Sequence, residues 1–270
     1  MLHILVLAAA TSAAPAIVSG DWLQAHLTDP NVRVIDVGDA DEYGKGHIPG
    51  ARVLDHMATV TTAGNEHRLA ANDVLARALA NAGAADGTHV ILYGETPMAT
   101  AWVGSAFAAV GHADEVSWLD GGFPTWKQEQ RPIATAATPA GTGTLTIRPA
   151  DVFVDAAWVR AHLQSPTTKI LDVRTQKEWD GGHVPNATLV RWQDLYADVK
   201  MQKLKSPEEI RALLAKAGVG PTQEVVTYCA VGMRASVMGW LAKSVGVPTR
   251  IYIGSWQDWS RDATNPVVKP

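Results

Sequence analysis

The sequence contains a repeat that returns in its second half after a long, constant interval. Segments 34–51 and 170–187 share an apolar run that ends in Asp-Val, followed by a Gly-His-x-Pro turn. The aspartates of the two runs, Asp36 and Asp172, are 136 residues apart, and the histidines of the two turns are separated by the same 136 residues. A period of this length indicates duplication of a whole domain, because the units of a solenoid repeat every ~20 to 50 residues. The 270 residues also suit two domains.

Within each copy, short β-branched runs alternate with longer segments rich in Ala and Leu. The expected strands include 32–37, 90–93 and 251–253, and the expected helices include 73–82 and 207–217. Strands that alternate with helices predict an α/β fold, in which a mostly parallel sheet carries helices on both faces. The last of these helices has a clear start, because Ser206 is followed by Pro207 and Glu209, the pattern of an N-cap with a capping box.

The composition divides the chain into four parts. Residues 16–133 and 150–270 are the two copies, and 134–149 is dense in Thr, Ala, Gly and Pro, which indicates an extended linker. Residues 1–15 are apolar and end in small residues, so they are either a signal peptide or an N-terminal tail, although the basic stretch that usually opens a signal peptide is absent. The first alternative predicts a periplasmic or exported protein, and the second predicts a cytoplasmic one.

The overall composition excludes several classes of function. Hydrophobic residues make up 47% of the chain and charged residues 19%, and the formal net charge is −4. No cluster of Lys and Arg offers the positive surface that nucleic acids require, so no nucleic-acid partner is expected. No apolar run approaches the ~20 residues that cross a bilayer, so no membrane partner is expected. A single cysteine rules out an intrachain disulfide and a cysteine-rich metal site.

That single cysteine, Cys229, lies between an apolar β-branched run, 225–228, and a segment with helical character. A strand that delivers a thiol to a short loop before a helix places the sulfur among unpaired backbone N–H groups at the positive end of the helix dipole. Such a position favours the thiolate, which is the nucleophilic form. The alternative is a small buried hydrophobic residue, as most free cysteines are. The sequence setting favours the nucleophile.

The six residues that start at this cysteine resemble the active-site loop of the rhodanese sulfurtransferases, which begins with Cys, has Gly at its fourth position and leads into a helix. They are Cys229, Ala230, Val231, Gly232, Met233 and Arg234. The resemblance implies that Cys229 is catalytic and carries a persulfide between two half-reactions, and that the other five residues bind the substrate. It also implies two tandem rhodanese-like domains, a small sulfur donor such as thiosulfate or 3-mercaptopyruvate, and a thiophilic acceptor such as cyanide, a thiol or a protein. No metal or organic cofactor is implied.

The first copy differs at this loop. Alignment of Tyr93 with Tyr228 places Gly94 opposite Cys229, so the first copy has no thiol there. Pro97 follows closely, and a proline cannot supply a backbone N–H group to an anion. As in tandem members of the family, the first domain is expected to be catalytically silent and the second to be active.

The resemblance points to two further substrate-binding residues. Arg174 follows a strand in the Asp-x-Arg context of a family arginine, at the carboxyl edge of the sheet where α/β folds bind ligands. Its alternative role is a salt bridge with Asp172 or Glu178. His67 lies in a context similar to that of an interdomain histidine of mercaptopyruvate sulfurtransferases, and its alternative is a solvated surface residue. The histidines of the two Gly-His-x-Pro turns recur in the silent copy, so turn anchors are expected there.

Two other functions share these features. One is a noncatalytic persulfide carrier that serves a protein partner, which steady turnover of a small donor would distinguish from an enzyme. The other is a cysteine phosphatase of rhodanese fold. Those enzymes use a C-x5-R loop, whereas Cys229 to Arg234 is C-x4-R and fits one sulfur atom better than a phosphoryl group. Between the donors, 3-mercaptopyruvate is favoured over thiosulfate, because Ala230 and Val231 carry no charge with which to bind a dianion.

Overall fold

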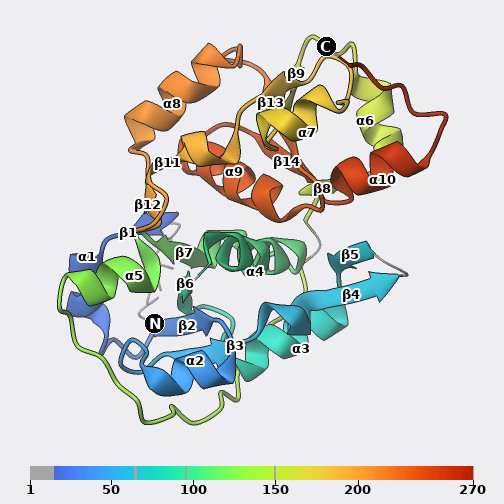
Figure 1. The fold of residues 1–270 in the computed structure, drawn as a ribbon. Helices are drawn as coiled ribbons and strands as arrows, with labels where there is room; N and C mark the ends of the chain where they lie inside the picture. The colour runs from blue at the N-terminus through green and yellow to red at the C-terminus, as the bar shows by residue number, and fades with distance from the viewer. Residues whose placement is uncertain (1–14, 64–65, 95, 149, 270) are drawn as a thin grey trace, which may run out of the picture.

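The computed structural model describes residues 15–63, 66–94, 96–148 and 150–269 (Figure 1). The expected signal peptide or tail, 1–15, falls almost entirely outside these described residues. Among the residues that are described, no helix is long and apolar enough to span a membrane, and no group of His, Cys, Asp or Glu side chains is arranged to hold a metal ion.

Each half of the chain folds around a five-stranded sheet, and the two sheets have the same strand order. The order is β1-β7-β6-β2-β3 in the first and β8-β14-β13-β9-β10 in the second, and all neighbours are parallel. The strands are β1 (Ile17–Val18), β2 (Val32–Val37), β3 (Arg52–Leu54), β6 (His89–Gly94), β7 (Val116–Leu119), β8 (Phe153–Val154), β9 (Thr168–Asp172), β10 (Thr188–Leu189), β13 (Glu224–Tyr228) and β14 (Thr249–Tyr252). The predicted α/β fold is confirmed.

Helices cover both faces of each sheet, because neighbouring residues of a strand point to opposite sides. In β2, Val34 packs with α1, α2 and α5, whereas Ile35 packs on the other side with α3 and α4. In the second domain α8 and α9 cover one face, and α6 and α10 cover the other. The helices are α1 (Gly20–His26), α2 (Ala40–Lys45), α3 (Asn72–Asn81), α4 (Pro97–Ala109), α5 (Gly122–Gln128), α6 (Ala156–His162), α7 (Gln176–Asp180), α8 (Pro207–Lys216), α9 (Met233–Ser244) and α10 (Ser255–Arg261), with short 3-10 turns at His56–Thr59, Ala113–Glu115 and Trp192–Leu195.

The helix expected after Ser206 begins as the sequence predicts. Ser206 Oγ accepts a hydrogen bond from the Glu209 N–H at 3.2 Å, and the Glu209 carboxylate accepts one from the Ser206 N–H at 2.9 Å. Pro207 occupies the first helical position, where its missing N–H costs nothing. The capping box of α8 is therefore confirmed.

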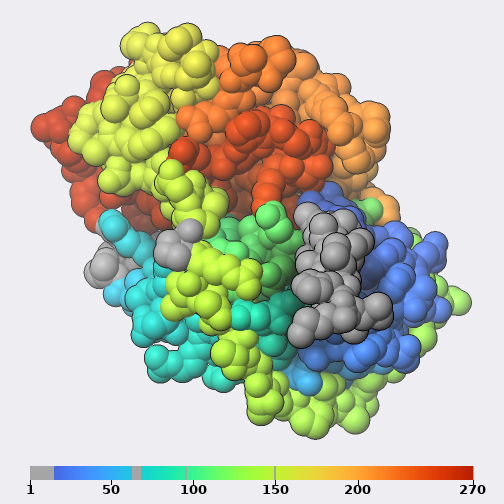
Figure 2. Space-filling model, turned by 180° about the vertical axis from the view of Figure 1, so that it is seen from behind, coloured from blue at the N-terminus to red at the C-terminus, as the bar shows by residue number. Residues whose placement is uncertain are grey.

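The segment that connects the two sheets lies on the first domain. Figure 2 shows this yellow-green segment running over the first domain and up to the second. The Arg52 guanidinium donates to the Pro139 carbonyl at 2.8 Å, and Leu145 is buried in the hydrophobic core of the first domain. The part of the expected linker that is described, 134–148, contains no helix or strand. Its course is therefore fixed by packing rather than by regular structure.

The two domains pack through α4 and α9, which follow the loop after the middle strand of each sheet (Figure 1). Gly104 of α4 lies so close to Trp240 of α9 that a Cβ atom at position 104 would be 2.3 Å from a ring carbon. Ala101 and Trp118 of the first domain belong to a hydrophobic cluster of the second. The apolar interior is therefore continuous from one domain into the other.

Each domain also extends an antiparallel hairpin toward the other. These hairpins are β4 (Val60–Ala63) with β5 (Glu66–Leu69), and β11 (Tyr196–Asp198) with β12 (Lys203–Leu204). The first places Arg68 3.4 Å from the Asp258 carboxylate of α10. The second receives a hydrogen bond at the Met201 carbonyl from Thr125 of α5 at 2.8 Å. The duplicated domains thus exchange equivalent contacts.

Candidate active site

The loop that Cys229 opens lies at the carboxyl end of β13, the middle strand of its sheet, and leads into α9. This is the edge at which open α/β sheets bind ligands. Gly232 caps α9 with a φ of 95°, a left-handed conformation that favours glycine. A Cβ atom there would lie 2.6 Å from the Ile253 carbonyl oxygen and 3.1 Å from a ring carbon of Trp102 in the first domain. The shape of the loop therefore depends on this glycine.

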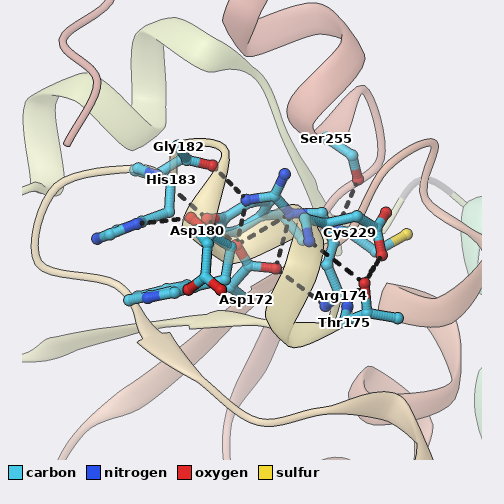
Figure 3. A network of polar contacts seen from close by, with 12 residues as sticks. Asp172, Arg174, Thr175, Asp180, Gly182, His183, Cys229 and Ser255 are labelled. Carbon is cyan, nitrogen blue, oxygen red and sulfur yellow. Dashed lines mark hydrogen bonds and ion pairs between the residues drawn. The ribbon is translucent and has the colours of Figure 1, made fainter. Parts of the chain in front are cut away.

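The Cys229 side chain is completely buried, with 0% of its surface exposed. The Gly232 N–H donates to its Sγ at 3.1 Å. The start of α10 holds the loop from the other side, because Ser255 Oγ accepts from the Cys229 N–H at 3.1 Å (Figure 3) and the Trp256 N–H donates to the Cys229 carbonyl at 2.9 Å. Burial alone suits both expectations for Cys229, but an N–H group directed at the sulfur favours the nucleophile.

Ser255 is a residue of this site that the sequence did not reveal. It is completely buried and has a φ of 54°, which is uncommon for a residue with a Cβ atom. Its hydroxyl donates to the Tyr252 carbonyl at 2.9 Å while it accepts from the Cys229 N–H. The repeat offers a clue to this conformation, because the matching residue of the first domain is a glycine, Gly122, with a similar φ of 49°. Only the domain that has the cysteine keeps a side chain at this position.

Arg234, in the first turn of α9, forms a bidentate ion pair with Glu178 of α7. Its two terminal nitrogens donate to the two Glu178 oxygens at 2.7 and 2.8 Å. Glu178 also completes the capping box of α7, since it accepts from the N–H and the hydroxyl of Thr175 at 2.9 and 2.7 Å. The hydrogen bonds from Arg234 lower the pKa of Glu178 to about 2. The hydrogen bonds to Glu178 raise the pKa of Arg234.

Arg174, which the resemblance assigned to substrate binding, is buried and paired with a carboxylate of its own domain. Only 2% of its side chain is exposed, and its Nε and Nη2 donate to the Asp172 carboxylate at distances between 2.6 and 3.0 Å (Figure 3). Nη2 also donates to the Gly182 carbonyl at 2.7 Å, and the guanidinium lies 4.5 Å from the centre of the Trp256 ring. A buried charge must be paired, and Asp172 is the nearest carboxylate along the chain. The alternative, a salt bridge with Asp172, is the arrangement that the structure contains.

Much of the frame around this site is present in both domains. The Tyr228 hydroxyl donates to Asp172 at 2.5 Å, and the Tyr93 hydroxyl donates to Asp36 at 2.8 Å. The histidines of the two Gly-His-x-Pro turns bond through Nδ1 to the carbonyl oxygen four residues earlier, at 2.9 and 3.3 Å. These histidines anchor turns, as expected.

The position of the first domain that matches Cys229 is closely packed. A Cβ atom at Gly94 would be 2.4 Å from the Val37 carbonyl oxygen, so a side chain has no room there. Gln202, from the β11–β12 hairpin, is buried, and its Nε2 donates to the Gly94 carbonyl at 3.2 Å. A residue of the second domain therefore occupies the space beside Gly94.

His67 lies in β5, where its backbone pairs with Thr62, and its side chain is outside what the structure describes. The two hairpins correspond in the repeat, with His67-Arg68-Leu69 opposite Gln202-Lys203-Leu204. Gln202 reaches the Gly94 carbonyl of the first domain, and the hairpin that carries His67 reaches the second domain at Asp258. The structure thus brings β5 to the second domain.

Comparison with other proteins extends the resemblance to the whole chain. The rhodanese-like domain family matches twice, over residues 19–129 and 155–262. The sulfur carrier protein TtuD of Thermus thermophilus is 29% identical, over 94% of this chain and 96% of its own length. The 3-mercaptopyruvate sulfurtransferase of Escherichia coli K12 is 28% identical, over 93% and 96%. The thiosulfate sulfurtransferase of Azotobacter vinelandii is 25% identical, over 94% and 97%.

Solved structures have the same fold. The crystal structure of YnjE matches with a TM-score of 0.84 at 24% identity, over 94% of this chain and 68% of that one. The anaerobic ergothioneine biosynthesis enzyme of Chlorobium limicola matches with a TM-score of 0.81 at 22% identity, over 94% and 70%. Because the family matches both halves and each half has the same sheet, this chain belongs to the rhodanese family of sulfurtransferases and has two tandem rhodanese domains.

Proposed function

We propose that the protein moves a sulfane sulfur from a small donor to a thiophilic acceptor through a persulfide on Cys229. The observation that carries this proposal is the place of the only cysteine in the chain. It is buried at the end of the middle strand, the Gly232 N–H is directed at its sulfur, and Arg234 follows in the next turn. In this proposal residues 150–270 form the catalytic domain. Residues 16–133 form a silent domain that packs against it, and the linker 134–149 connects the two.

Two half-reactions follow from this arrangement. The Cys229 thiolate first attacks the outer sulfur of the donor and forms a new S–S bond. With thiosulfate the original S–S bond breaks and sulfite leaves. With 3-mercaptopyruvate the C–S bond breaks, and pyruvate leaves after its carbanion takes up a proton. The acceptor then attacks the outer sulfur, the persulfide bond breaks and the thiolate returns, so that cyanide leaves as thiocyanate.

The loop and the hairpin supply the binding groups in this proposal. The backbone of Ala230, Val231, Gly232, Met233 and Arg234 surrounds the outer sulfur, which carries the negative charge of the persulfide. His67 is assigned to donor binding because of its family-like sequence context, and its strand β5 belongs to the hairpin that reaches the second domain at Asp258. Arg174 acts through Asp172 to fix the end of β9, and does not touch the donor.

A persulfide carrier that delivers sulfur to a protein is the second candidate, and the 29% identity with the sulfur carrier protein TtuD favours it. The two functions differ in turnover. An enzyme releases thiocyanate continuously from a small donor and cyanide, whereas a carrier stops after one sulfur per chain until its protein acceptor is added.

Replacement of Cys229 by Ser tests the proposal. The hydroxyl cannot form a persulfide, so we expect thiocyanate production to fall at least about a thousandfold while the unfolding midpoint stays near that of the wild type. Intact-mass measurement completes the test. Brief exposure to a donor should add one sulfur atom to the wild-type chain, and cyanide should remove it. Substantial activity in Cys229→Ser would refute the assignment.

A further inference from the structure

Glu178 neutralises the charge that would otherwise attract an anionic donor to the loop. Both of its oxygens accept from Arg234, and the pair is only partly open to solvent, with 16% of the arginine side chain and 32% of the glutamate side chain exposed. Thr175 fixes the same carboxylate by two further hydrogen bonds. The ion pair is therefore built into the start of α7 and does not depend on a chance contact between mobile side chains.

The duplication shows that the fold itself does not require this pair. The residue of the first domain that matches Glu178 is Glu42, which is largely exposed and pairs with Lys45 on its own helix. The residue that matches Arg234 is Ala99, which carries no charge. Both copies have the helix and its glutamate, but only the copy with the cysteine directs the glutamate at a basic residue of the loop. The pair is thus a property of the reactive site.

No unmatched positive charge remains among the residues that the resemblance assigned to donor binding and whose side chains the structure describes. Arg234 is matched by Glu178, Arg174 is matched by Asp172, and the loop residues between Cys229 and Arg234 are uncharged. A dianion gains its binding energy from charge-assisted hydrogen bonds to unpaired cations. Here it would have to compete with a carboxylate that already occupies the guanidinium.

We infer that Glu178 is a specificity-determining residue, which disfavours doubly charged donors such as thiosulfate and selects donors with at most one negative charge. A mercapto-carboxylate and an alkyl persulfide both belong to the selected class. The inference rests on the proposed sulfurtransferase function of Cys229. In this inference the Glu178 carboxylate discriminates between donors by repelling the more highly charged one. Many specific sites reject a competing ligand in this way.

The test compares kcat/KM for thiosulfate and for 3-mercaptopyruvate, with cyanide as acceptor, in the wild type and in Glu178→Gln. Loss of the carboxylate frees Arg234, so the ratio of thiosulfate to mercaptopyruvate efficiency should rise about tenfold, chiefly through a lower KM for thiosulfate. Asp180→Asn is the matched control. It removes the same charge from the same helix, but Asp180 is exposed and bonds to Gln176, so the ratio should stay within about twofold of wild type.

An unchanged ratio in a folded Glu178→Gln that still uses both donors overturns the inference and leaves the proposed function in place. Failure of the wild type to use either donor overturns the proposed function instead. A second measurement needs no variant. Against 3-mercaptopyruvate in the wild type, sulfate should inhibit no more than about twice as strongly as methanesulfonate, which has one charge fewer. Sulfate inhibition about ten times stronger than that by methanesulfonate would also refute the role of Glu178.

Discussion

Ser255 has a left-handed backbone conformation that the first domain gives to Gly122. A residue with a Cβ atom costs about 1–2 kcal/mol in this conformation. Such strain persists where surrounding contacts impose it, and here the hydroxyl joins the Cys229 N–H to the Tyr252 carbonyl. The strain at Ser255 therefore accompanies a fixed position of the Cys229 backbone.

Two substitutions at this position separate the strain from the hydrogen bonds. Ser255→Ala keeps the strain and removes both bonds, so the free energy of unfolding should fall by about 1–3 kcal/mol. Ser255→Gly also removes the bonds but relieves the strain, so it should be more stable than the alanine variant by about 1 kcal/mol. Both should lose sulfur transfer to a similar degree, because both leave the Cys229 N–H unpaired. Urea unfolding and steady-state kinetics measure this, and full activity in either variant would contradict it.

The residues of the loop could be predicted from the sequence because they are contiguous, whereas their supports could not. Ser255 lies 26 residues after Cys229, and Glu178 lies 56 residues before Arg234. The sequence allowed Arg174 a salt bridge with Asp172 or with Glu178, and only the folded chain assigns one carboxylate to each arginine. Side-chain pairing across elements depends on tertiary geometry that a local pattern does not contain.

Helices and parallel strands could be predicted where the hydrophobic pattern is long. The expected helix 73–82 is α3 within one residue, and 207–217 is α8. The β4–β5 and β11–β12 hairpins were not predicted, because strands of two to four residues are too short to show an alternation. These short elements nevertheless carry contacts between the domains, since Gln202 bonds to Gly94 and Arg68 pairs with Asp258.

The ion pair that joins α7 to α9 should make stability depend on pH in the acid range. The pKa of Glu178 falls from 4.5 to about 2 in the folded chain, chiefly through the hydrogen bonds from Arg234. A carboxyl with a depressed pKa stabilises the fold above its unfolded pKa, and this contribution is lost as the pH falls toward the folded value. The stability difference between wild type and Glu178→Gln should thus be constant above about pH 5 and shrink from there to about pH 2. Urea unfolding across this range measures it, and a difference independent of pH would contradict it.

The molecule as a whole is held together where α4 meets α9, and the close approach of Gly104 to Trp240 sets the distance between the domains. Trp240 also donates its indole N–H to the Ala16 carbonyl at 2.9 Å, which ties α9 to the start of the first domain. The loop of Cys229 opens directly into α9, and Gly232 contacts Trp102 of α4. Domain packing and the shape of the Cys229 loop are therefore coupled.

Addition of one methyl group to this interface tests the coupling. Alanine stabilises a helix by about 0.5–1 kcal/mol relative to glycine. In Gly44→Ala of α2 no atom beyond the neighbouring backbone lies within 4 Å of the new Cβ, so this variant should raise the free energy of unfolding by that amount. Gly104→Ala gains the same helix propensity, but its methyl group forces the Trp240 ring aside. The free energy of unfolding should therefore fall by about 1–2 kcal/mol net, and activity should fall as well. Thermal unfolding and kinetics of both variants provide the comparison. Equal stabilisation by the two substitutions would show that the interface is loose.

The first domain cannot recover a nucleophile by one substitution at Gly94. A cysteine there would bring its Cβ within 2.4 Å of the Val37 carbonyl, and Gln202 already bonds to the backbone at that position. Strand, loop and the hairpin of the other domain would have to change together. The duplication is therefore hard to reverse at this position, because a single substitution does not give the first copy a second thiol site.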